Sequence, residues 1–196
     1  MILRDLENYA RFWDAGTNPE FNRYREFVTS TPECCERTHL AGHCTGSAFI
    51  VNPKADKVLL LFHPFLKRWL QPGGHADGSS DLLDVAKRET HEETGLPMEA
   101  LRTWPKEGAD RIPLDLDIHT IPERKQEPLH SHYDLRFLLV ADPEWPLTQE
   151  SPDMTLEWLD LQDIGRKTDE ESVLRMARKV RDLPRDAAGY LSFNSL

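Results

Sequence analysis

Glutamates gather in one short segment of this 196-residue chain, PGGHADGSSDLLDVAKRETHEETGL, which spans residues 72–96. At about 100° per residue of an α-helix, Glu89, Glu92 and Glu93 fall on one face. Clustered carboxylates raise one another's pKa and cost stability unless a cation lies among them. Because Mg²⁺ and Mn²⁺ prefer oxygen ligands of this kind, the pattern indicates a site for Mg²⁺, with Mn²⁺ as the alternative ion. A solvated acidic helix face is the other interpretation.

A glycine turn precedes these glutamates. Gly73 and Gly74 permit backbone conformations and close approaches that other residues resist, as a loop between a sheet and a helix requires. Ser79 or Ser80 is expected to cap the helix, which ends at Gly95. Simple turn chemistry would explain the glycines equally well without the glutamates.

Apolar periodicity predicts the elements that position this segment. Helical spacing over residues 2–13, and a cap and proline at Asn18 and Pro19, predict two N-terminal helices. Short β-rich runs follow, and strands flanked by helices indicate an α/β sandwich. The predicted later elements are strands at 44–51, 57–63, 112–121, 132–141 and 155–161 and a final helix within 170–182.

The pattern G-x5-S-x7-R-E-T-x-E-E-x-G-L, from Gly74 to Leu96, resembles the Nudix box G-x5-E-x7-R-E-U-x-E-E-x-G-U, in which U is usually a bulky aliphatic residue. Ser80 stands in place of the first box glutamate, and Thr90 in place of the aliphatic residue. A weaker resemblance extends over residues 42–182. It implies a Nudix-like α/β/α sandwich around a mixed sheet at 42–196, preceded by an N-terminal helical extension at 1–41.

The resemblance also implies roles for the box residues. The metal ligands would be Glu89, Glu92 and Glu93, with the carbonyl of Gly74 as a further oxygen. Arg88 would hold the glutamates in register. Since Ser80 removes one usual partner of that arginine, nearby aspartates at 77, 81 or 84 are candidate replacements.

The implied activity is metal-dependent hydrolysis of a phosphoanhydride bond in a nucleoside diphosphate linked to another moiety. A carboxylate would deprotonate the attacking water, and Glu92 and Glu93 are candidates within the box. Glu150, in a loop before a strand, is the favoured base outside the box, and Glu157 is the alternative. An ordinary solvated loop acid is the competing interpretation of Glu150.

Two polar strand faces suggest where the substrate lies. Alternation places Asp115, Asp117 and His119 on one face of their strand and His130, His132, Asp134 and Arg136 on one face of the next, so each strand is expected to keep one solvated face. His132 and Arg136 are candidate contacts to substrate phosphates. The histidine pair alone would also suit a transition metal, but no third ligand appears at informative spacing.

Other signals are less specific. Trp69 is a candidate for stacking on a base, although core packing is the more usual role of such a residue. The connection at 120–129 carries Arg124 and Lys125 and is consistent with a flap over the substrate. The N-terminal helices are expected to cover the pocket, to form a homodimer interface or simply to pack on the sheet.

Substrate and partners follow from these features and from charge. The flap, the polar faces and the N-terminal arm favour ADP-ribose or a sugar nucleotide over a nucleoside triphosphate or a dinucleoside polyphosphate. A noncatalytic nucleotide sensor is the alternative of another class, because Ser80 departs from the box. The net charge of −10 disfavours nucleic acid and anionic membranes, so the expected partner is a nucleotide-derived small molecule.

Simple sequence patterns indicate the expected location of the protein and the state of its thiols. The longest apolar runs are too short to cross a bilayer, and the first residues lack the basic and apolar regions of a signal peptide, so a cytoplasmic location is expected. The three cysteines cannot all pair within one chain, and none forms a CxxC pair, so they are interpreted as reduced thiols.

Overall fold

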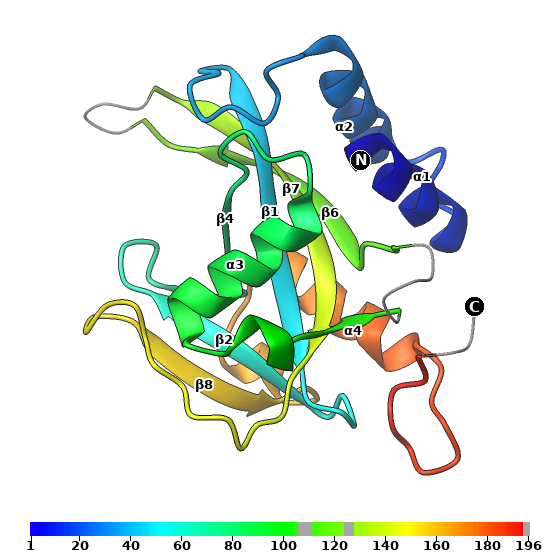
Figure 1. The fold of residues 1–196 in the computed structure, drawn as a ribbon, viewed down its shortest axis with the longest axis vertical. Helices are drawn as coiled ribbons and strands as arrows, with labels where there is room; N and C mark the ends of the chain where they lie inside the picture. The colour runs from blue at the N-terminus through cyan, green and yellow to red at the C-terminus, as the bar shows by residue number, and fades with distance from the viewer. Residues whose placement is uncertain (106–110, 124–127, 194–196) are drawn as a thin grey trace.

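A mixed β-sheet flanked by helices forms the protein in the computed structural model, which describes residues 1–105, 111–123 and 128–193 (Figure 1). The helices are α1 (Ile2–Phe12), α2 (Pro19–Ser30), α3 (Leu82–Thr94) and α4 (Glu171–Asp182), with short 3-10 helices at Met98–Ala100 and Ile164–Arg166. The strands are β1 (Gly42–Val51), β2 (Lys57–His63), β3 (Arg68–Leu70), β4 (Gly73–His75), β5 (Arg102–Trp104), β6 (Asp115–Ile121), β7 (His130–Val140) and β8 (Thr155–Asp160).

The long strands β1 and β7 form the centre of the sheet. They run parallel, while the other strand pairs are antiparallel, so the sheet is mixed. The main order is β3-β2-β1-β7-β5, with β4 paired to β1, β6 to β7 and β8 to β2. The long predicted strands are confirmed, whereas the three-residue strands β3, β4 and β5 were missed because such short runs carry no readable periodicity.

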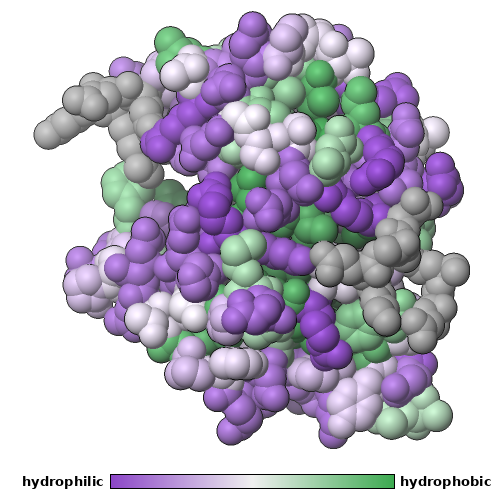
Figure 2. All heavy atoms as spheres, in the orientation of Figure 1, coloured by the Kyte–Doolittle hydropathy of each residue, from purple (hydrophilic) through white to green (hydrophobic). Residues whose placement is uncertain are grey.

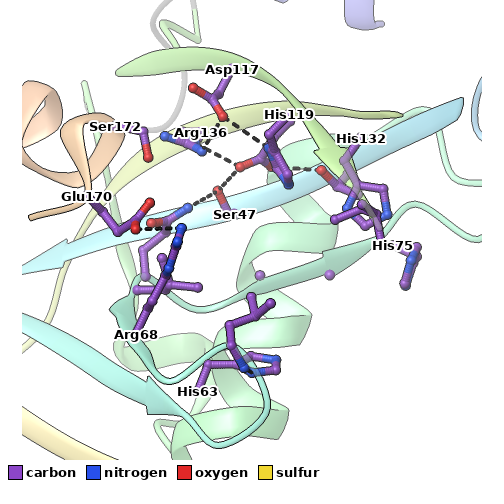
Figure 3. A pocket seen from close by; sticks show the side chains of 18 of the residues that line it. Ser47, His63, Arg68, His75, Asp117, His119, His132, Arg136, Glu170 and Ser172 are labelled. Atoms are coloured by element: carbon purple, nitrogen blue, oxygen red, sulfur yellow. Dashed lines mark hydrogen bonds and ion pairs between the residues drawn. The ribbon is translucent and has the colours of Figure 1, made fainter. Parts of the chain in front are cut away.

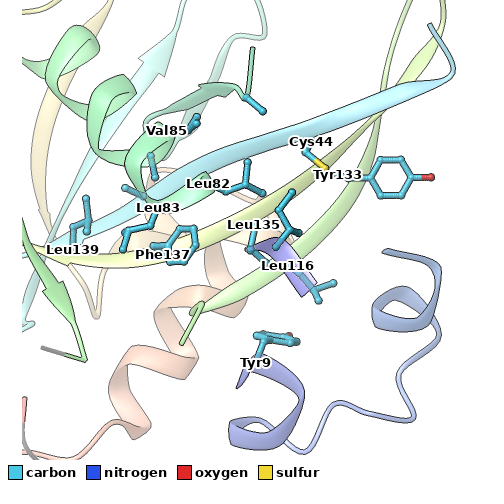
Figure 4. Packing of buried hydrophobic residues seen from close by; sticks show 14 of the residues in the cluster. Tyr9, Cys44, Leu82, Leu83, Val85, Leu116, Tyr133, Leu135, Phe137 and Leu139 are labelled. Carbon is cyan, nitrogen blue, oxygen red and sulfur yellow. The ribbon is translucent and has the colours of Figure 1, made fainter. Parts of the chain in front are cut away.

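Alternation along β1 builds the two layers of core. Ala48 and Ile50 pack with α1, α2 and α3, whereas Phe49 and Val51 pack with α4 on the opposite face. Figure 1 shows α3 crossing in front of β1 and β7 while α4 lies behind them. The predicted α/β/α sandwich is therefore confirmed. Figure 4 labels part of the first layer, in which α3 contributes Leu82, Leu83 and Val85 and β7 contributes Leu135, Phe137 and Leu139.

The N-terminal helices pack on the sheet, which is one of the three roles expected for them. The buried Tyr24 hydroxyl donates a 2.8 Å hydrogen bond to the carbonyl of Tyr133 on β7, and the Phe27 and Tyr133 rings stack at 3.7 Å. The Arg111 guanidinium lies between Asp5 of α1 and Asp81, which immediately precedes α3. An ion-pair cluster thus joins α1 to the start of α3.

The predicted serine cap of α3 was wrong. Asp81 is the N-cap, and its carboxylate accepts a 3.2 Å hydrogen bond from the N–H of Asp84. Ser79 instead accepts a hydrogen bond from the N–H of Asp81. The end of the helix is as expected, because Gly95 adopts the left-handed conformation with φ 73°. The buried Thr90 hydroxyl donates to Ala86 O at 2.7 Å, which satisfies a polar group where an aliphatic residue was expected.

The face of the molecule drawn in Figure 2 is covered largely by hydrophilic side chains, with apolar ones scattered among them. Within the described ranges, no helix has both the length and the apolar character that crossing a bilayer requires.

Candidate active site

The carboxylates of α3 meet the glycine backbone of β4. Oε2 of Glu93 accepts a 2.9 Å hydrogen bond from the N–H of Gly73. The Glu89 carboxylate lies against Gly74 so closely that a Cβ on this glycine would be 2.3 Å from the carboxyl carbon. Gly74 is therefore required for space rather than for an unusual φ. The turn and the helix form one unit, because Glu93 binds the Gly73 N–H and Glu89 fills the room that Gly74 leaves.

Burial perturbs these acids. The pKa of Glu93 is raised to about 8, chiefly by burial; the Gly73 hydrogen bond opposes this shift, and the nearby charges of Glu89, Glu150 and Glu92 add to it. The pKa of Glu89 is also raised, first by burial and then by Glu92, although Arg88 opposes the shift. Without a cation, Glu93 holds its proton at neutral pH. A cation among these oxygens would favour the ionised form.

Arg88 binds the glutamates from within the same helix. Its Nη1 lies 2.7 Å from Oε1 of Glu89 and 3.3 Å from Oε1 of Glu92. Its Nη2 donates a 3.1 Å hydrogen bond to the carbonyl of His75. Ser80 is exposed. Asp81, one of the acids expected to compensate for Ser80, is held by Arg111. The glutamates themselves and a strand carbonyl are thus the partners of Arg88.

A cavity of about 350 Å³ opens beside the box (Figure 3). Gly73, Gly74 and Glu93 form part of one wall. Figure 3 shows His75, His119 and His132 at one end and Arg68 paired with Glu170 at another, where the ion pair measures 2.7 Å. The remaining lining residues come chiefly from β1, β2, β6 and β7 and include Thr45, Ser47, Leu61, His63, Leu66, Leu70, Asp117, His130, Asp134 and Arg136.

A buried ionic network underlies the cavity. The guanidinium of Arg136 lies 2.8 Å from Asp134, 3.0 Å from Asp117 and 3.6 Å from Asp115. Two cations of α4 complete the charge balance: Arg175 pairs with Asp115 and Asp117, and Lys179 pairs with Asp115 at 2.7 Å. The predicted solvated face is therefore wrong for these strands, because Asp115, Asp134 and Arg136 are buried. Three carboxylates already neutralise Arg136, so its phosphate-binding role stays a prediction.

Histidines lie next to this ionic network in the sheet. The register pairs His43 of β1 with His132 of β7, and His132 with His119 of β6. The side chain of His75 on β4 joins them, with its ring 5.0 Å from His132. His130 Nε2 lies 3.2 Å from His132 Nε2. Burial, followed by the proximity of His119 and the other rings, lowers the pKa of His132 to about 2, so this imidazole is neutral.

Sequence reasoning missed His43 because nothing in the local pattern around it suggests a ligand. The signal that could have identified it is pairing between β1 and β7, which brings residues 43 and 132 together although they are far apart in the chain. His75 was noted only as a neighbour of Gly74. The structure joins both of these histidines to the predicted HxH pair of β7.

Trp69, the predicted stacking residue, lies outside the cavity wall. Trp69 sits between the lining residues Arg68 and Leu70, so strand alternation turns it to the opposite face, where Phe62 and Lys167 are its neighbours. The predicted flap residues Arg124 and Lys125 lie outside the described residues.

The two acids proposed as bases outside the box differ in their surroundings. Glu150 is exposed, yet its charge contributes to the raised pKa of Glu93, so the loop lies within electrostatic reach of the box. Glu157 instead forms a 2.7 Å ion pair with Lys167. The structure thus favours Glu150 over Glu157 as a group near the box, and its catalytic role stays a prediction.

The donor set fits a divalent cation. Glu89, Glu92 and Glu93 offer hard carboxylate oxygens along α3, and Gly74 brings a backbone segment against the first of them. One arginine offsets only part of their charge, which is the condition under which a cation is favourable.

Comparison with known proteins places the chain in a family. A NUDIX domain model matches residues 44–180. A protein of Lactococcus lactis subsp. cremoris (strain MG1363) named "Probable DHNTP pyrophosphohydrolase" is 34% identical over 106 residues, which are 53% of this chain and 58% of that protein. The matched part of this chain thus spans less than two thirds of that relative's length.

Solved structures agree on the fold. A NUDIX family hydrolase from Clostridium perfringens superposes with a TM-score of 0.55 at 22% identity, over 71% of this chain and 96% of the other. The dihydroneopterin triphosphate pyrophosphohydrolase of E. coli superposes with a TM-score of 0.52 at 14% identity, over 71% and 95%. The α3 glutamates, their glycine turn and the domain match together show that this chain belongs to the NUDIX domain family.

Proposed function

We propose that this protein is a Nudix-type hydrolase that cleaves a phosphoanhydride bond in a nucleotide-derived substrate and depends on Mg²⁺. The observation that carries the proposal is the contact of Glu93 with Gly73 and of Glu89 with Gly74, beside a cavity of about 350 Å³. This volume lies within the range of pockets for small molecules. Family membership and the domain match support the same class of reaction.

Glu89, Glu92 and Glu93 would hold the divalent cation, with Mn²⁺ as the alternative ion. When bound, the cation neutralises phosphate charge and makes water acidic enough to deprotonate near neutral pH. Glu93 lines the cavity and is turned toward it, so its carboxylate is the base that we favour. Glu150 is the second candidate, because its charge already acts on Glu93.

Arg88 would keep Glu89 and Glu92 in place through its 2.7 Å and 3.3 Å contacts. In the cavity wall, His132 is neutral and can donate a hydrogen bond to a phosphate oxygen only from the ring nitrogen that carries the hydrogen. Apolar side chains such as Leu61, Leu66 and Leu70 offer a surface for the rest of the substrate. The cavity lining thus includes both polar and apolar side chains.

The substrate that we place first is a nucleoside diphosphate linked to another moiety, with ADP-ribose or a sugar nucleotide as representatives. His119, His130 and Pro122 line the cavity, which supports a substrate that reaches the connection between β6 and β7. The N-terminal helices give no such support, because residues 2–30 do not line the described cavity.

The second candidate is a triphosphate, and one observation favours it. The relative that is 34% identical is named as a probable DHNTP pyrophosphohydrolase. A protein with the same fold is the dihydroneopterin triphosphate pyrophosphohydrolase of E. coli. Dihydroneopterin triphosphate therefore belongs in any substrate test beside nucleoside triphosphates and dinucleoside polyphosphates.

A product screen with Mg²⁺ would decide between these substrates. Purified protein is incubated with ADP-ribose, a sugar nucleotide, dihydroneopterin triphosphate, a nucleoside triphosphate and a dinucleoside polyphosphate. Two monophosphate products from ADP-ribose would support the first candidate, whereas release of pyrophosphate from a triphosphate would support the second. Thermal stabilisation by a ligand without any product over long incubation would instead indicate a noncatalytic sensor.

A further inference from the structure

We propose that His43, His130 and His132 form a binding site for a transition-metal ion, Zn²⁺, in the wall of the same cavity. The three side chains bring one ring nitrogen each to within 4.8 Å of the others. They come from two strands, with His43 on β1 and the other two on β7. This site differs from the carboxylates of α3 in its position and in its ligand class.

The spacing of the nitrogens suits a metal centre. Two ligand nitrogens on a tetrahedral Zn²⁺ ion lie roughly 3.3 Å apart, given metal–nitrogen distances of about 2.0–2.1 Å. Nε2 of His130 and Nε2 of His132 are 3.2 Å apart. The His43 ring lies 5.0 Å from that of His130 and 4.9 Å from that of His132. The three rings therefore lie together, with one ring nitrogen of each within 4.8 Å of the others.

A backbone contact fixes the tautomer of one ligand. Nδ1 of His130 lies 2.7 Å from the carbonyl oxygen of Pro128. Because a carbonyl only accepts, Nδ1 carries the hydrogen, and in the neutral ring Nε2 presents its lone pair to His132. Metal-binding histidines usually donate their other N–H to a carbonyl or carboxylate in this way. The contact therefore prepares His130 as an Nε2 ligand.

Two further histidines lie beside these three. Nδ1 of His119 lies 3.0 Å from Oδ2 of Asp117, a carboxylate contact that favours a free Nε2 in the same manner. The rings of His119 and His75 lie 5.4 Å and 5.0 Å from that of His132. Five of the eight histidines of the chain therefore meet here, and both of these additional rings line the cavity.

The ligand chemistry selects the class of ion. Neutral imidazoles suit Zn²⁺ and its neighbours among the transition metals, whereas Mg²⁺ prefers carboxylate oxygen and water. His43 and His130 are 3% and 7% exposed, while His132 lines the cavity. The proposed ion would rest on buried rings and remain reachable from the cavity.

A thiol cluster makes the test stricter, because thiolates also bind Zn²⁺. Cys34, Cys35 and Cys44 also place their ligand atoms within 4.8 Å of one another. Zinc measured in solution must therefore be assigned to one cluster or the other. His39 lies on the thiol side and serves as a histidine control, since its charge acts on Cys34.

The test titrates Zn²⁺ into the metal-stripped full chain by calorimetry, with excess Mg²⁺ present to occupy the α3 carboxylates. We expect one ion per chain. His43→Gln and His130→Gln should each weaken binding at least about tenfold, whereas Cys35→Ser and His39→Gln should leave it unchanged. With Co²⁺ as the probe, tetrahedral d–d bands should appear without a thiolate-to-cobalt charge-transfer band. These readouts do not depend on hydrolysis, so they hold or fail separately from the proposed function.

The opposite results would overturn the proposal: no Zn²⁺ binding in excess Mg²⁺, loss of binding in Cys35→Ser, or a thiolate charge-transfer band with Co²⁺. If the histidine variants do not fold, anomalous scattering at the zinc edge from crystals of the unaltered chain decides the matter. A zinc peak among His43, His130 and His132 supports the site, and a peak only at the thiols or at the glutamates excludes it.

Discussion

The Glu93 carboxylate on α3 accepts a 2.9 Å hydrogen bond from the backbone N–H of Gly73, the first residue of β4. This contact turns the last glutamate of the box toward the cavity and away from the helix surface. Its neighbour Glu89 packs on Gly74, so consecutive glycines hold two of the three acids. The site therefore depends on both the glutamates and the glycines that they contact.

Glu93→Gln should lower turnover at least about 100-fold with Mg²⁺ saturating, because it removes a ligand charge and a base while keeping an oxygen for Gly73. Steady-state kinetics on the substrate found by the product screen would measure the loss. Glu99→Gln is the matched control, since Glu99 is exposed on a 3-10 helix. Equal turnover in Glu93→Gln and the unaltered chain would sink the assignment.

The free energy of unfolding of the metal-free protein should decrease as the pH rises, because the pKa of Glu93 is higher in the folded state than in the unfolded state. Its pKa is raised from 4.5 to about 8, so between these values the folded state holds a proton that the unfolded state has released. The stabilisation that protonated Glu93 contributes is therefore fully present below pH 4.5 and is lost as the pH passes through about 8. Glu93→Gln lacks this dependence and should be more stable than the unaltered chain at high pH, by on the order of 2 kcal/mol.

Urea unfolding in the presence of a chelator, at roughly pH 5 and pH 9, would measure this difference. Added Mg²⁺ should then stabilise the unaltered chain more than Glu93→Gln, because only the former gains an ionised ligand. A variant that is less stable than the unaltered chain at the higher pH would contradict the raised pKa.

Gly74→Ala should weaken Mg²⁺ binding and lower turnover, each at least about tenfold, because small displacements of reacting groups are costly. The new methyl carbon would lie 2.3 Å from the carboxyl carbon of Glu89, so the acid must move. Calorimetric titration with Mg²⁺ checks the affinity. Gly16→Ala is the control, since nothing lies within 4 Å of a Cβ at that position. Similar Mg²⁺ affinity in both variants would show that Glu89 tolerates the methyl group.

Arg111→Gln should destabilise the fold by about 3 kcal/mol, because it leaves Asp5 and Asp81 without their shared cation. Asp5 is fully buried, and burial raises its pKa even with the arginine present. Arg166→Gln is the control, since Arg166 forms an exposed pair with Asp163 whose loss should cost under about 1 kcal/mol. Urea denaturation of both variants tests the comparison, and an equal loss in the two would refute a special role for Arg111.

Local patterns in the sequence determined the elements and the acidic face. The spacing of Glu89, Glu92 and Glu93 decides that a helix presents them together, and Gly95 decides where that helix ends. Alternation along β6 and β7 was also correct about which side chains share a face. These properties depend on dihedral angles and periodicity within a few residues, so they can be predicted without knowledge of the rest of the chain.

Tertiary structure decided how the faces meet and which of them are buried. Pairing of β1 with β7 brings His43 to His132, and it buries Asp134 and Arg136 where a solvated face was expected. The N-cap of α3 is likewise Asp81 and not the predicted serine. Asp81 also binds Arg111 from a distant segment. No local signal specifies these outcomes, because register, burial and ion pairing between distant segments depend on the free energy of the whole packed sheet.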